Sequence, residues 1–402
     1  MSPVAHAHAD AVVVGGGVIG AAIAHQLALA GIGRIVLCDQ GRVNAQGATS
    51  RSGGLLRLHH TASADTRLAA RSLPVFEQWA DIIGGDCGYR RTGFVMIVGE
   101  ERADALRTNA AVAAAAAGYR RVEVVERAEL REIYPGLRTE GVGLAAYEPE
   151  GGYADPMAAS AALLTAAYRL GVSPAEGIRA VKVLEHEGSV TGVLTSVGRI
   201  DSPLVVLAGG AWGSAPVEYL GLHIPVTARR IGLAQAELRG AGRRGHRASV
   251  PTCIDDTTGS YFRPDGLDRF YFGVPSKPDT ELGRDVEPLS ESELESAIAA
   301  ISHRVPAAAE APLVGTRSGV DGYTPDKRPV VGAAGPDGLY LAIGFSGGGF
   351  KLAPAVAELA ALEILEGGAV PGKAEQELLN PYRPQRFLAG HPIRPEAPYD
   401  HM

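Results

Sequence analysis

The chain opens on an alternation of apolar runs and glycines. Ala11–Val14 is a short apolar run with the pattern of a buried parallel strand. From Gly17 to Ala30, apolar residues recur three and four positions apart, which predicts a helix, and the glycines that follow end it. Arg34–Cys38 is a second apolar run, which ends at Asp39. The segment therefore predicts a strand–helix–strand unit with a right-handed crossover between parallel strands.

Farther along, the pattern predicts more helices and strands, joined by loops rich in glycine and proline. Val181–Leu207 alternates as a hairpin does and finishes in an apolar run. The tail from Gly390 to Met402 is rich in proline, and we expect it to be poorly ordered. The other expected helices are Asp65–Trp79, Ala103–Ala117, Pro156–Leu170, Glu291–Ser302 and Lys351–Leu365, and the other expected strands are Gly93–Val98, Tyr261–Arg263, Phe270–Gly273 and Leu339–Ile343.

Composition narrows the classes of function. The 402 residues suggest two domains, and their net charge of −7 argues against a nucleic-acid-binding surface. The three cysteines stand far apart, without metal-site spacing or a disulfide framework, so we expect no metal and a reducing, cytoplasmic compartment. Residues 11–33 are long enough to resemble a transmembrane helix. Their glycines and the polar pair His25–Gln26 argue against a membrane span.

The first chemical motif is Gly15-x-Gly17-x-x-Gly20, between the first strand and the first helix. Its first glycine allows a tight turn, the second lets a pyrophosphate approach the backbone, and the third lets helix and strand pack closely. The helix N-terminus offers unpaired N–H groups to the phosphates. Asp39 ends the next strand, where a carboxylate accepts hydrogen bonds from a ribose hydroxyl. The motif predicts a dinucleotide; the acid disfavours NADP and leaves FAD and NAD open.

Three further segments decide between these cofactors. Residues 205–212 read VVLAGGAW, residues 315–332 read GTRSGVDGYTPDKRPVVG, and residues 344–351 read GFSGGGFK. In this order, and together with the opening glycine motif, they resemble the FAD-dependent amine oxidoreductases of the D-amino-acid oxidase superfamily. The similarity is greatest to the sarcosine oxidase and glycine oxidase group.

The resemblance implies an α/β fold with two domains. A Rossmann-type FAD-binding domain, with a parallel sheet and helices, would be assembled from residues 8–85, 147–215 and 318–380. A substrate domain with a mixed or antiparallel sheet would take residues 86–146 and 216–317, and residues 388–402 would form the tail. The helix-rich patterns do occur in the first set of stretches, and the alternating strands between them.

The resemblance also implies the reaction. FAD would oxidise the C–N bond of a small amino or imino acid, such as sarcosine, glycine, a proline-like or a D-amino acid, by hydride transfer to flavin N5. O2 or another electron acceptor would reoxidise the flavin, and the chain could form homo- or hetero-oligomers. Alternatives are a dehydrogenase that passes electrons to a quinone or partner subunit, a biosynthetic amine oxidase with a larger substrate, and a non-catalytic FAD-binding subunit.

Candidate catalytic residues follow from the same alignment of motifs. Lys351 matches the lysine that holds the substrate carboxylate in the sarcosine oxidase branch, and Arg57 matches an arginine with the same role. Guanidinium binds carboxylate bidentately. Gly54 stands where those relatives have a further arginine, which leaves the identity of the substrate open. Arg263 is an alternative carboxylate clamp.

Two other positions concern the flavin ring and oxygen. His59 or His60 could lie near the flavin, or both could be surface residues. Tyr271 replaces the lysine that promotes the reaction with oxygen in the sarcosine oxidase branch, so we expect slower reoxidation by O2. The N–H groups of Ser346–Gly349 are expected to face the N1/C2=O edge of the flavin. The residues expected to contact FAD are Gly15, Gly17, Val18, Ile19, Gly20, Asp39, Gln40, Thr49, Ser50, Arg51, Ala208, Gly209, Trp212, Gly319, Gly347, Gly348, Gly349, Phe350 and Lys351.

We predict that FAD is bound without a covalent link. The sarcosine oxidase branch attaches its flavin through a cysteine seven residues before the Asp of the Thr-Pro-Asp motif, and Gly319 takes that position here. Acid precipitation of the purified protein should therefore release the yellow colour into the supernatant. Colour retained in the pellet would contradict the prediction.

Overall fold

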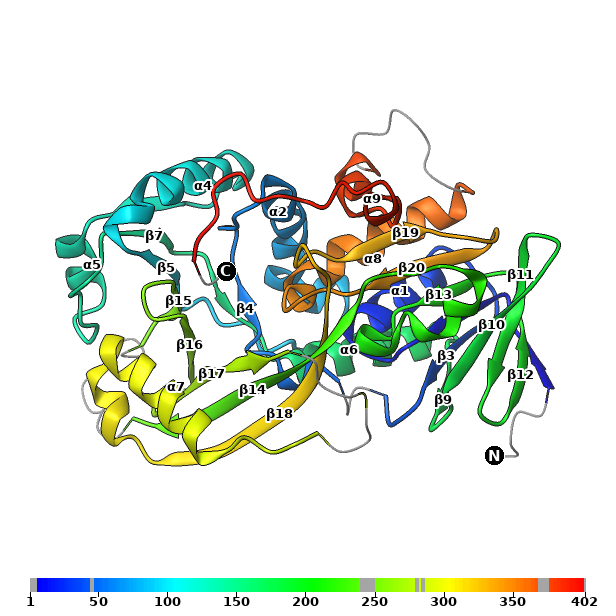
Figure 1. Ribbon diagram of the computed structural model, residues 1–402, viewed down its shortest axis with the longest axis horizontal. Coiled ribbons are helices and arrows are strands. Elements are labelled where there is room, and N and C mark those ends of the chain that lie inside the picture. The colour runs from blue at the N-terminus through cyan, green and yellow to red at the C-terminus, as the bar shows by residue number, and fades with distance from the viewer. Residues whose placement is uncertain are drawn as a thin grey trace.

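The computed structural model describes residues 6–43, 47–238, 250–278, 282, 286–367 and 376–400. Two large sheets organise it into two lobes that lie side by side (Figure 1). The first sheet has six strands in the order β19 (Val330–Ala333), β20 (Leu339–Ile343), β13 (Val205–Leu207), β2 (Ala11–Val14), β3 (Ile35–Asp39) and β9 (Ser173–Glu176). β19 pairs antiparallel with β20, and the other pairs are parallel.

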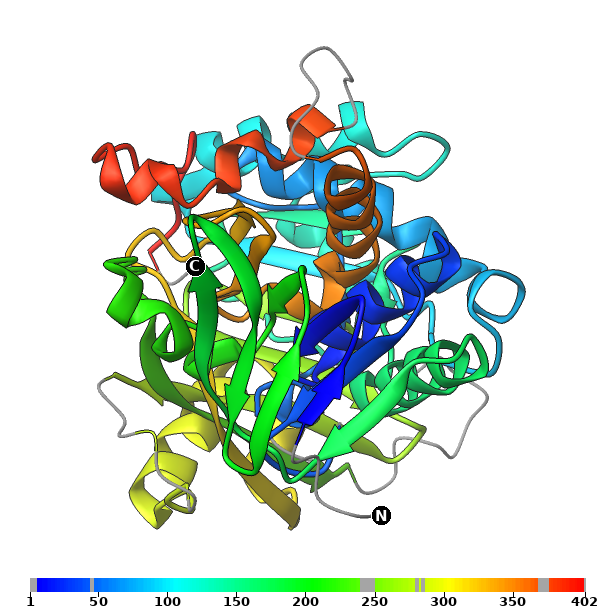
Figure 2. The same ribbon diagram turned by 90° about the vertical axis from the view of Figure 1, so that its right-hand side faces the viewer.

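Alternate residues of these strands pack on opposite faces of the first sheet. Val13 belongs to the core beneath the helices, which are α1 (Val18–Leu29), α2 (Ser63–Glu77), α6 (Pro156–Arg169) and α8 (Gly349–Leu365). Val12 belongs to the core on the other face. A four-stranded sheet covers that second face (Figure 2); its order is β1 (His6–His8), β12 (Gly198–Asp201), β11 (Ser189–Thr195) and β10 (Ala180–His186).

The second lobe contains an eight-stranded mixed sheet. Its order is β18 (Leu313–Tyr323), β14 (Thr227–Glu237), β17 (Arg269–Lys277), β16 (Ser260–Asp265), β15 (Thr252–Asp255), β5 (Phe94–Val98), β7 (Leu144–Glu148) and β6 (Glu123–Val125). Only β15 and β5 are parallel neighbours among the described strands of this sheet. Its helices are α4 (Ala103–Ala116), α5 (Arg127–Ile133) and α7 (Glu291–Arg304). The short elements are α3 (Trp79–Ile82), β4 (Leu55–Leu56), β8 (Gly152–Tyr153) and α9 (Gln385–Leu388).

The expected fold class is confirmed, and most expected elements lie within a few residues of their predicted bounds. The region expected to be one hairpin contains β10, β11, β12 and β13. The sequence did not predict β14, or that β18 runs through Tyr323 in the second sheet. β18 thus crosses the expected boundary at residue 318, and the division into domains stays a proposal. Among the described residues, no helix is long and apolar enough to cross a membrane.

The expectation of a poorly ordered tail is wrong for residues 390–400. Ala397 and Tyr399 are buried, and the backbone of this segment bonds to the body of the protein. The Glu396 N–H, for example, donates to the carbonyl oxygen of Thr61. Proline richness lowers the entropy of an extended segment that has partners, so it does not by itself predict disorder. Residues 401 and 402 lie outside the described residues.

A fully buried ion pair fixes α7 to the second sheet. Arg304 Nε, at the last residue of α7, lies 2.6 Å from Asp255 Oδ2, at the last residue of β15, and neither side chain is exposed. Arg304 also donates to the Glu140 carbonyl at 3.2 Å and to Thr257 Oγ1 at 3.0 Å. Loss of either partner would leave a buried charge without compensation.

We predict that Arg304→Met lowers the free energy of unfolding by about 3–5 kcal/mol, the usual cost of breaking a buried pair. Urea denaturation of the purified protein measures this. The matched control is Arg199→Met, which breaks an ion pair with Asp201 at a partly exposed position, where the loss should stay under about 1 kcal/mol. Equal losses in the two variants would contradict the assignment.

Candidate functional site

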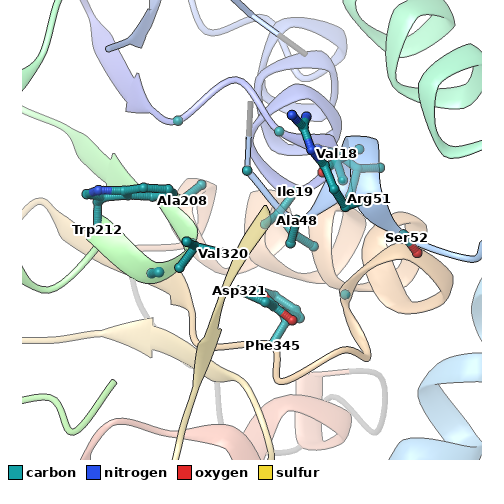
Figure 3. A pocket seen from close by; sticks show the side chains of 18 of the residues that line it. Val18, Ile19, Ala48, Arg51, Ser52, Ala208, Trp212, Val320, Asp321 and Phe345 are labelled. Carbon is teal, nitrogen blue, oxygen red and sulfur yellow. The ribbon is translucent and has the colours of Figure 1, made fainter. Parts of the chain in front are cut away.

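A cavity of about 460 Å³ runs along the carboxyl ends of β2, β3 and β13 to the start of α8 (Figure 3). This is where parallel α/β sheets hold their ligands. Fifteen of the expected cofactor contacts line it, and so does Arg57. They are Gly15, Gly17, Val18, Ile19, Asp39, Gln40, Thr49, Arg51, Ala208, Gly209, Trp212, Gly347, Gly349, Phe350 and Lys351. Gly20, Ser50, His59, Tyr271, Gly319 and Gly348 are not part of its lining.

At one end of the cavity, glycines bring backbone segments together. Gly15 has φ of 107°, which side chains rarely tolerate. A Cβ at Gly20 would overlap the carbonyl oxygen of Gly15, which explains why Gly20 supports the loop without lining the cavity. Asp39 is held by two backbone groups, because Oδ2 accepts from Gly16 N at 2.7 Å and Oδ1 from Gly41 N at 2.8 Å. This end combines a fixed carboxylate with the N-terminus of α1.

One N–H group at the start of α1 already has a partner. Thr49 Oγ1 accepts from Val18 N at 3.1 Å, so the hydroxyl of Thr49 caps the helix and lines the cavity. The positive end of the helix dipole faces the same space. An anion such as a pyrophosphate fits here, since it takes the remaining first-turn N–H groups as donors.

At the other end, the glycine loop before α8 differs from the expectation. Ser346 N donates to Gly322 O at 3.0 Å, and Gly348 N donates to Phe345 O at 2.8 Å. Gly347 N donates to Asp321 Oδ2 at 2.7 Å. Three of the four N–H groups expected to face a flavin therefore have acceptors within the protein. The donors left by helix geometry are those in the first turn of α8, from Gly349 to Lys351.

Asp321 is a cavity residue that lies in the glycine-rich motif of residues 315–332, and the sequence predicted no role for it. It is buried at the end of β18 and accepts from Gly347 N and, at 2.8 Å, from Gly322 N. Burial raises the pKa of its carboxyl group to about 6, although these two N–H groups and Lys351 oppose the rise. The signal in the sequence was an acid directly before the Gly-Tyr-Thr-Pro turn. Asp321 ties β18 to the loop that begins α8.

Arg57 is a buried cation of the cavity wall. Its side chain is 6 % exposed, its guanidinium lies 5.5 Å from the centre of the Phe94 ring, and its Nε and Nη1 have no hydrogen-bond partner among the described residues. Burial lowers its pKa to about 10, against the opposing charge of Glu148. It therefore stays protonated at neutral pH. A buried, unsatisfied guanidinium is costly unless an anion binds it.

Lys351 lies in the first turn of α8 and faces the same end of the cavity. Burial, followed by the charge of Arg57, lowers the pKa of its ammonium group to about 7. Asp65 and Asp321 oppose this shift, while Arg328 adds to it. Arg57 and Lys351 thus form a pair of cations that a single carboxylate would stabilise.

The two histidines after Arg57 lie behind the cavity wall. His59 Nε2 is 2.5 Å from the hydroxyl oxygen of Tyr399 in the C-terminal tail. Burial and then the charge of Arg57 lower the pKa of His59 to about 3, and the pKa of His60 also falls well below its usual value. Both are neutral and buried, so neither is a surface residue. The structure does not place His59 on the cavity wall.

The strand pair β16–β17 places Tyr261 on the cavity wall in place of Tyr271. The ring of Tyr261 occupies the space that a Cβ at Gly273 would need. Tyr271 packs instead on the guanidinium of Arg263, which lies 4.2 Å from the ring centre of Tyr153 and 4.6 Å from that of Tyr271. Arg263 also donates to Gly53 O at 2.5 Å. Its guanidinium is thus occupied as a support for the Gly53 loop, outside the cavity lining.

Two glycines stand at positions where the sequence departs from the sarcosine oxidase branch that it resembles. Gly54 has φ of 70°, and a Cβ there would overlap the carbonyl oxygen of Ala154, so an arginine does not fit at this position. A Cβ at Gly319 would lie 2.9 Å from Cγ of Arg51. The side chain of Arg51 therefore fills the space beside Gly319, the position that matches the flavin-attaching cysteine in the resemblance to the sarcosine oxidase branch. Ser50 is buried next to it and bonds to Gly47 O at 3.3 Å.

The cavity residues fit FAD. A glycine cradle that any Cβ would block lies at one end, and the cation pair Arg57 and Lys351 lies at the other. Between them the lining is mostly small or apolar, including Ala208, Gly209 and Phe345. Such a wall accommodates a long ligand that has an anionic middle and an aromatic ring.

Comparisons with known proteins agree with this geometry. A family model described as FAD dependent oxidoreductase matches residues 10–362. 4-Methylaminobutanoate oxidase (formaldehyde-forming) of Paenarthrobacter nicotinovorans is 28% identical over 90% of this chain and 44% of its own length. The chain thus spans about half the length of the curated relatives it matches.

Two solved structures show how far the fold extends. L-proline dehydrogenase of P. horikoshii superposes with a TM-score of 0.83 at 24% identity and covers 96% of this chain and 100% of its own. Glycine oxidase of Geobacillus kaustophilus has a TM-score of 0.80 at 25% identity, covering 94% of this chain and 99% of its own. With the family model matching most of its length, this chain belongs to the DAO family of FAD-dependent oxidoreductases.

Proposed function

We propose that this chain binds FAD non-covalently and oxidises the C–N bond of a small amino or imino acid to the imine. The observation that carries the proposal is the pair of cations at one end of the cavity, above all the buried Arg57, whose Nε and Nη1 have no hydrogen-bond partner among the described residues. The names of two similar proteins, 4-methylaminobutanoate oxidase and glycine oxidase, support a carboxylate-bearing amine as substrate.

The chain's own residues would hold the cofactor in three places. The first turn of α1 and Gly15–Gly17 would bind the pyrophosphate, and Asp39 would accept a ribose hydroxyl. The first turn of α8 would donate to the polar edge of the ring system. Bound FAD would supply the two-electron acceptor that the oxidation requires.

Substrate binding depends on Arg57 and Lys351. Arg57 is protonated throughout the neutral range and offers a planar fork, while Lys351 adds a point charge. The two would fix the carboxylate, so that the neighbouring C–N bond is held against the cofactor. Tyr261 and Leu55 line the cavity and would exclude water from this end. Because His59 and His60 lie behind the wall, the amine is expected to enter in its neutral form.

The reduced flavin would pass its electrons to O2 or to another oxidant. By the resemblance, Tyr271 stands where the sarcosine oxidase branch carries a lysine that promotes the reaction with oxygen. A protein similar to this chain is named a dehydrogenase, the sarcosine dehydrogenase of Homo sapiens. These two observations favour slow reoxidation by O2 and keep a quinone or partner subunit as the alternative acceptor.

We also propose a cytoplasmic location, since Cys38, Cys87 and Cys253 form no disulfide bonds. Two alternative functions are an amine oxidase with a larger substrate and a non-catalytic FAD-binding subunit. The presence of both Arg57 and Lys351 argues against the second. The chain could also form homo- or hetero-oligomers.

We predict that an amino or imino acid bleaches the flavin band of the purified protein without oxygen. The panel is sarcosine, glycine, proline, D-alanine and 4-methylaminobutanoate, with dimethylamine as the control that lacks a carboxylate. Admission of air or of a soluble quinone then shows which acceptor restores the colour. Bleaching by dimethylamine alone, or by nothing in the panel, would contradict the proposal.

A second prediction concerns pH. Lys351 has a pKa of about 7, lowered by burial and by Arg57, so it is charged below this pH and neutral above it. The Kd of propanoate, a carboxylate that lacks an amine, should therefore rise about tenfold as pH increases from about 6 to about 8.5. Spectral perturbation of the flavin measures this Kd.

The matched control for this pH dependence is Lys351→Met. This variant should bind propanoate weakly at every pH, with a flat profile, while its affinity for FAD stays close to that of the wild type. An unchanged slope in Lys351→Met would show that another group titrates, and the charged groups that act on Lys351 are Arg57, Arg328, Asp65 and Asp321.

A further inference from the structure

The C-terminal strap, which we define as residues 391–400, links the two lobes. It leaves α9 beside the first sheet, where Ile393 N donates to Asp326 Oδ2 at 2.9 Å. It then crosses toward α4 of the second lobe (Figure 1). At its far end, Asp400 N donates to Asp256 Oδ2 at 2.9 Å, just after β15. The strap lies beyond residue 362, where the match to the family model ends.

The middle of the strap is docked by side chains of the body. Glu396 Oε1 accepts from Ser63 Oγ at 2.7 Å, at the start of α2. Asn109 Nδ2, on α4, donates to Ala397 O at 2.9 Å, and both residues are buried. These bonds come from both lobes and fix the strap on either side of the segment that leads into Tyr399.

Tyr399 is inserted into the core of the second lobe. It is 6 % exposed and packs in a cluster with Phe94, Met96 and Leu106. Its ring plane lies 11° from parallel to the imidazole of His59, with the ring centres 5.8 Å apart. Its hydroxyl group lies 2.5 Å from His59 Nε2. The strap thus contributes a buried aromatic residue to the region behind the cavity.

This region is also the support of Arg57. The guanidinium lies over Phe94, in the same cluster as Tyr399, and Tyr399 and His59 both interact with its charge. Glu148 accepts from Leu58 N and His59 N, each at 2.7 Å, so the backbone that follows Arg57 is fixed. The imidazole ring is not fixed in this way. Its Nδ1 has no partner, and the hydroxyl of Tyr399 is its one side-chain bond among the described residues.

We propose that Tyr399 is a positioning residue, which holds His59 in place and thereby aims the guanidinium of Arg57 at the substrate carboxylate. The inference rests on the proposed function, because it assumes that Arg57 binds a carboxylate. The hydroxyl of Tyr399 keeps the imidazole from rotating toward Arg57. Nε and Nη1 of the guanidinium then have no competing polar partner among the described residues. The substrate site would then depend on a segment distant from it in sequence.

Tyr399→Phe tests the proposal, since it removes the hydroxyl and keeps the ring. We expect the Kd of propanoate, measured by flavin spectral perturbation, to rise about 3–10-fold. A charged contact between guanidinium and carboxylate contributes about 10–150-fold to the affinity, and a misaligned guanidinium loses part of that contribution. The KM of the substrate should rise with it, while kcat and the Kd of FAD change by less than about twofold. The matched control is Tyr119→Phe, which removes a hydroxyl from an exposed tyrosine that bonds to Glu77 and should change none of these constants.

A double-mutant cycle separates positioning from a general structural effect. In an Arg57→Met background, Tyr399→Phe should no longer change propanoate binding, because the group that it positions is absent. An equal effect in both backgrounds, or unchanged binding in Tyr399→Phe alone, would overturn the proposal. If Tyr399→Phe cannot be purified, Glu396→Gln loosens the strap at Ser63 and should raise the Kd in the same direction; unchanged binding there would also overturn it. Wild-type protein that binds no propanoate would instead refute the proposed function.

Discussion

The desolvated positive charge of Arg57 is the constraint on which the site depends. A guanidinium in an apolar wall needs anionic partners, and the carboxylates nearby are already committed. Glu148 accepts two backbone N–H groups, Asp65 pairs with Arg328, and Asp321 accepts from Gly347 and Gly322. Arg57, Lys351 and Arg328 formally balance these three carboxylates, but Nε and Nη1 of Arg57 have no hydrogen-bond acceptor among the described residues. A carboxylate-bearing ligand would supply that acceptor, and this favours amino acids over simple amines as the substrate.

The rest of the fold holds this charge against the cofactor cavity. The six-stranded sheet brings the glycine loop of β2 and the start of α8 to the same edge. The eight-stranded sheet supplies Phe94, beneath Arg57, and Tyr261, on the wall. The segment around β4 carries Arg57 between the two sheets. One lobe thus contributes the loops that would hold the cofactor, and the other contributes the aromatic side chains beside Arg57. The site lies between the two lobes.

Local motifs were predictable from the sequence because their function is local. The Gly15–Gly20 loop and Asp39 act within a few residues of their own strand or helix, so their spacing predicted a dinucleotide site. The role expected for the glycines before α8 came from the resemblance. Arg57 and Lys351 followed from a resemblance that covers most of the chain. Arg57 is buried and Lys351 is partly buried, and both environments, with the resulting shifts in pKa, depended on packing that no local pattern encodes.

Long-range contacts account for what the sequence did not show. Tyr399 and His59 are 340 positions apart, and the tail gave no periodic signal to link them. Tyr271 matched a lysine by motif, yet the packing of Tyr261 against Gly273 decides which tyrosine reaches the cavity. The acceptors of the Ser346–Gly348 N–H groups include an Asp321 carboxylate from another element. Side-chain direction, more than the position of an element, was the missing information.

β18 contributes to both lobes. It pairs with β14 in the eight-stranded sheet, and near its C-terminal end Asp321 accepts from Gly347 N in the loop that begins α8 of the other lobe. Each lobe therefore provides one side of this hydrogen bond. A displacement of one lobe relative to the other would pull on the loop at the start of α8, and so would change the shape of the cavity wall.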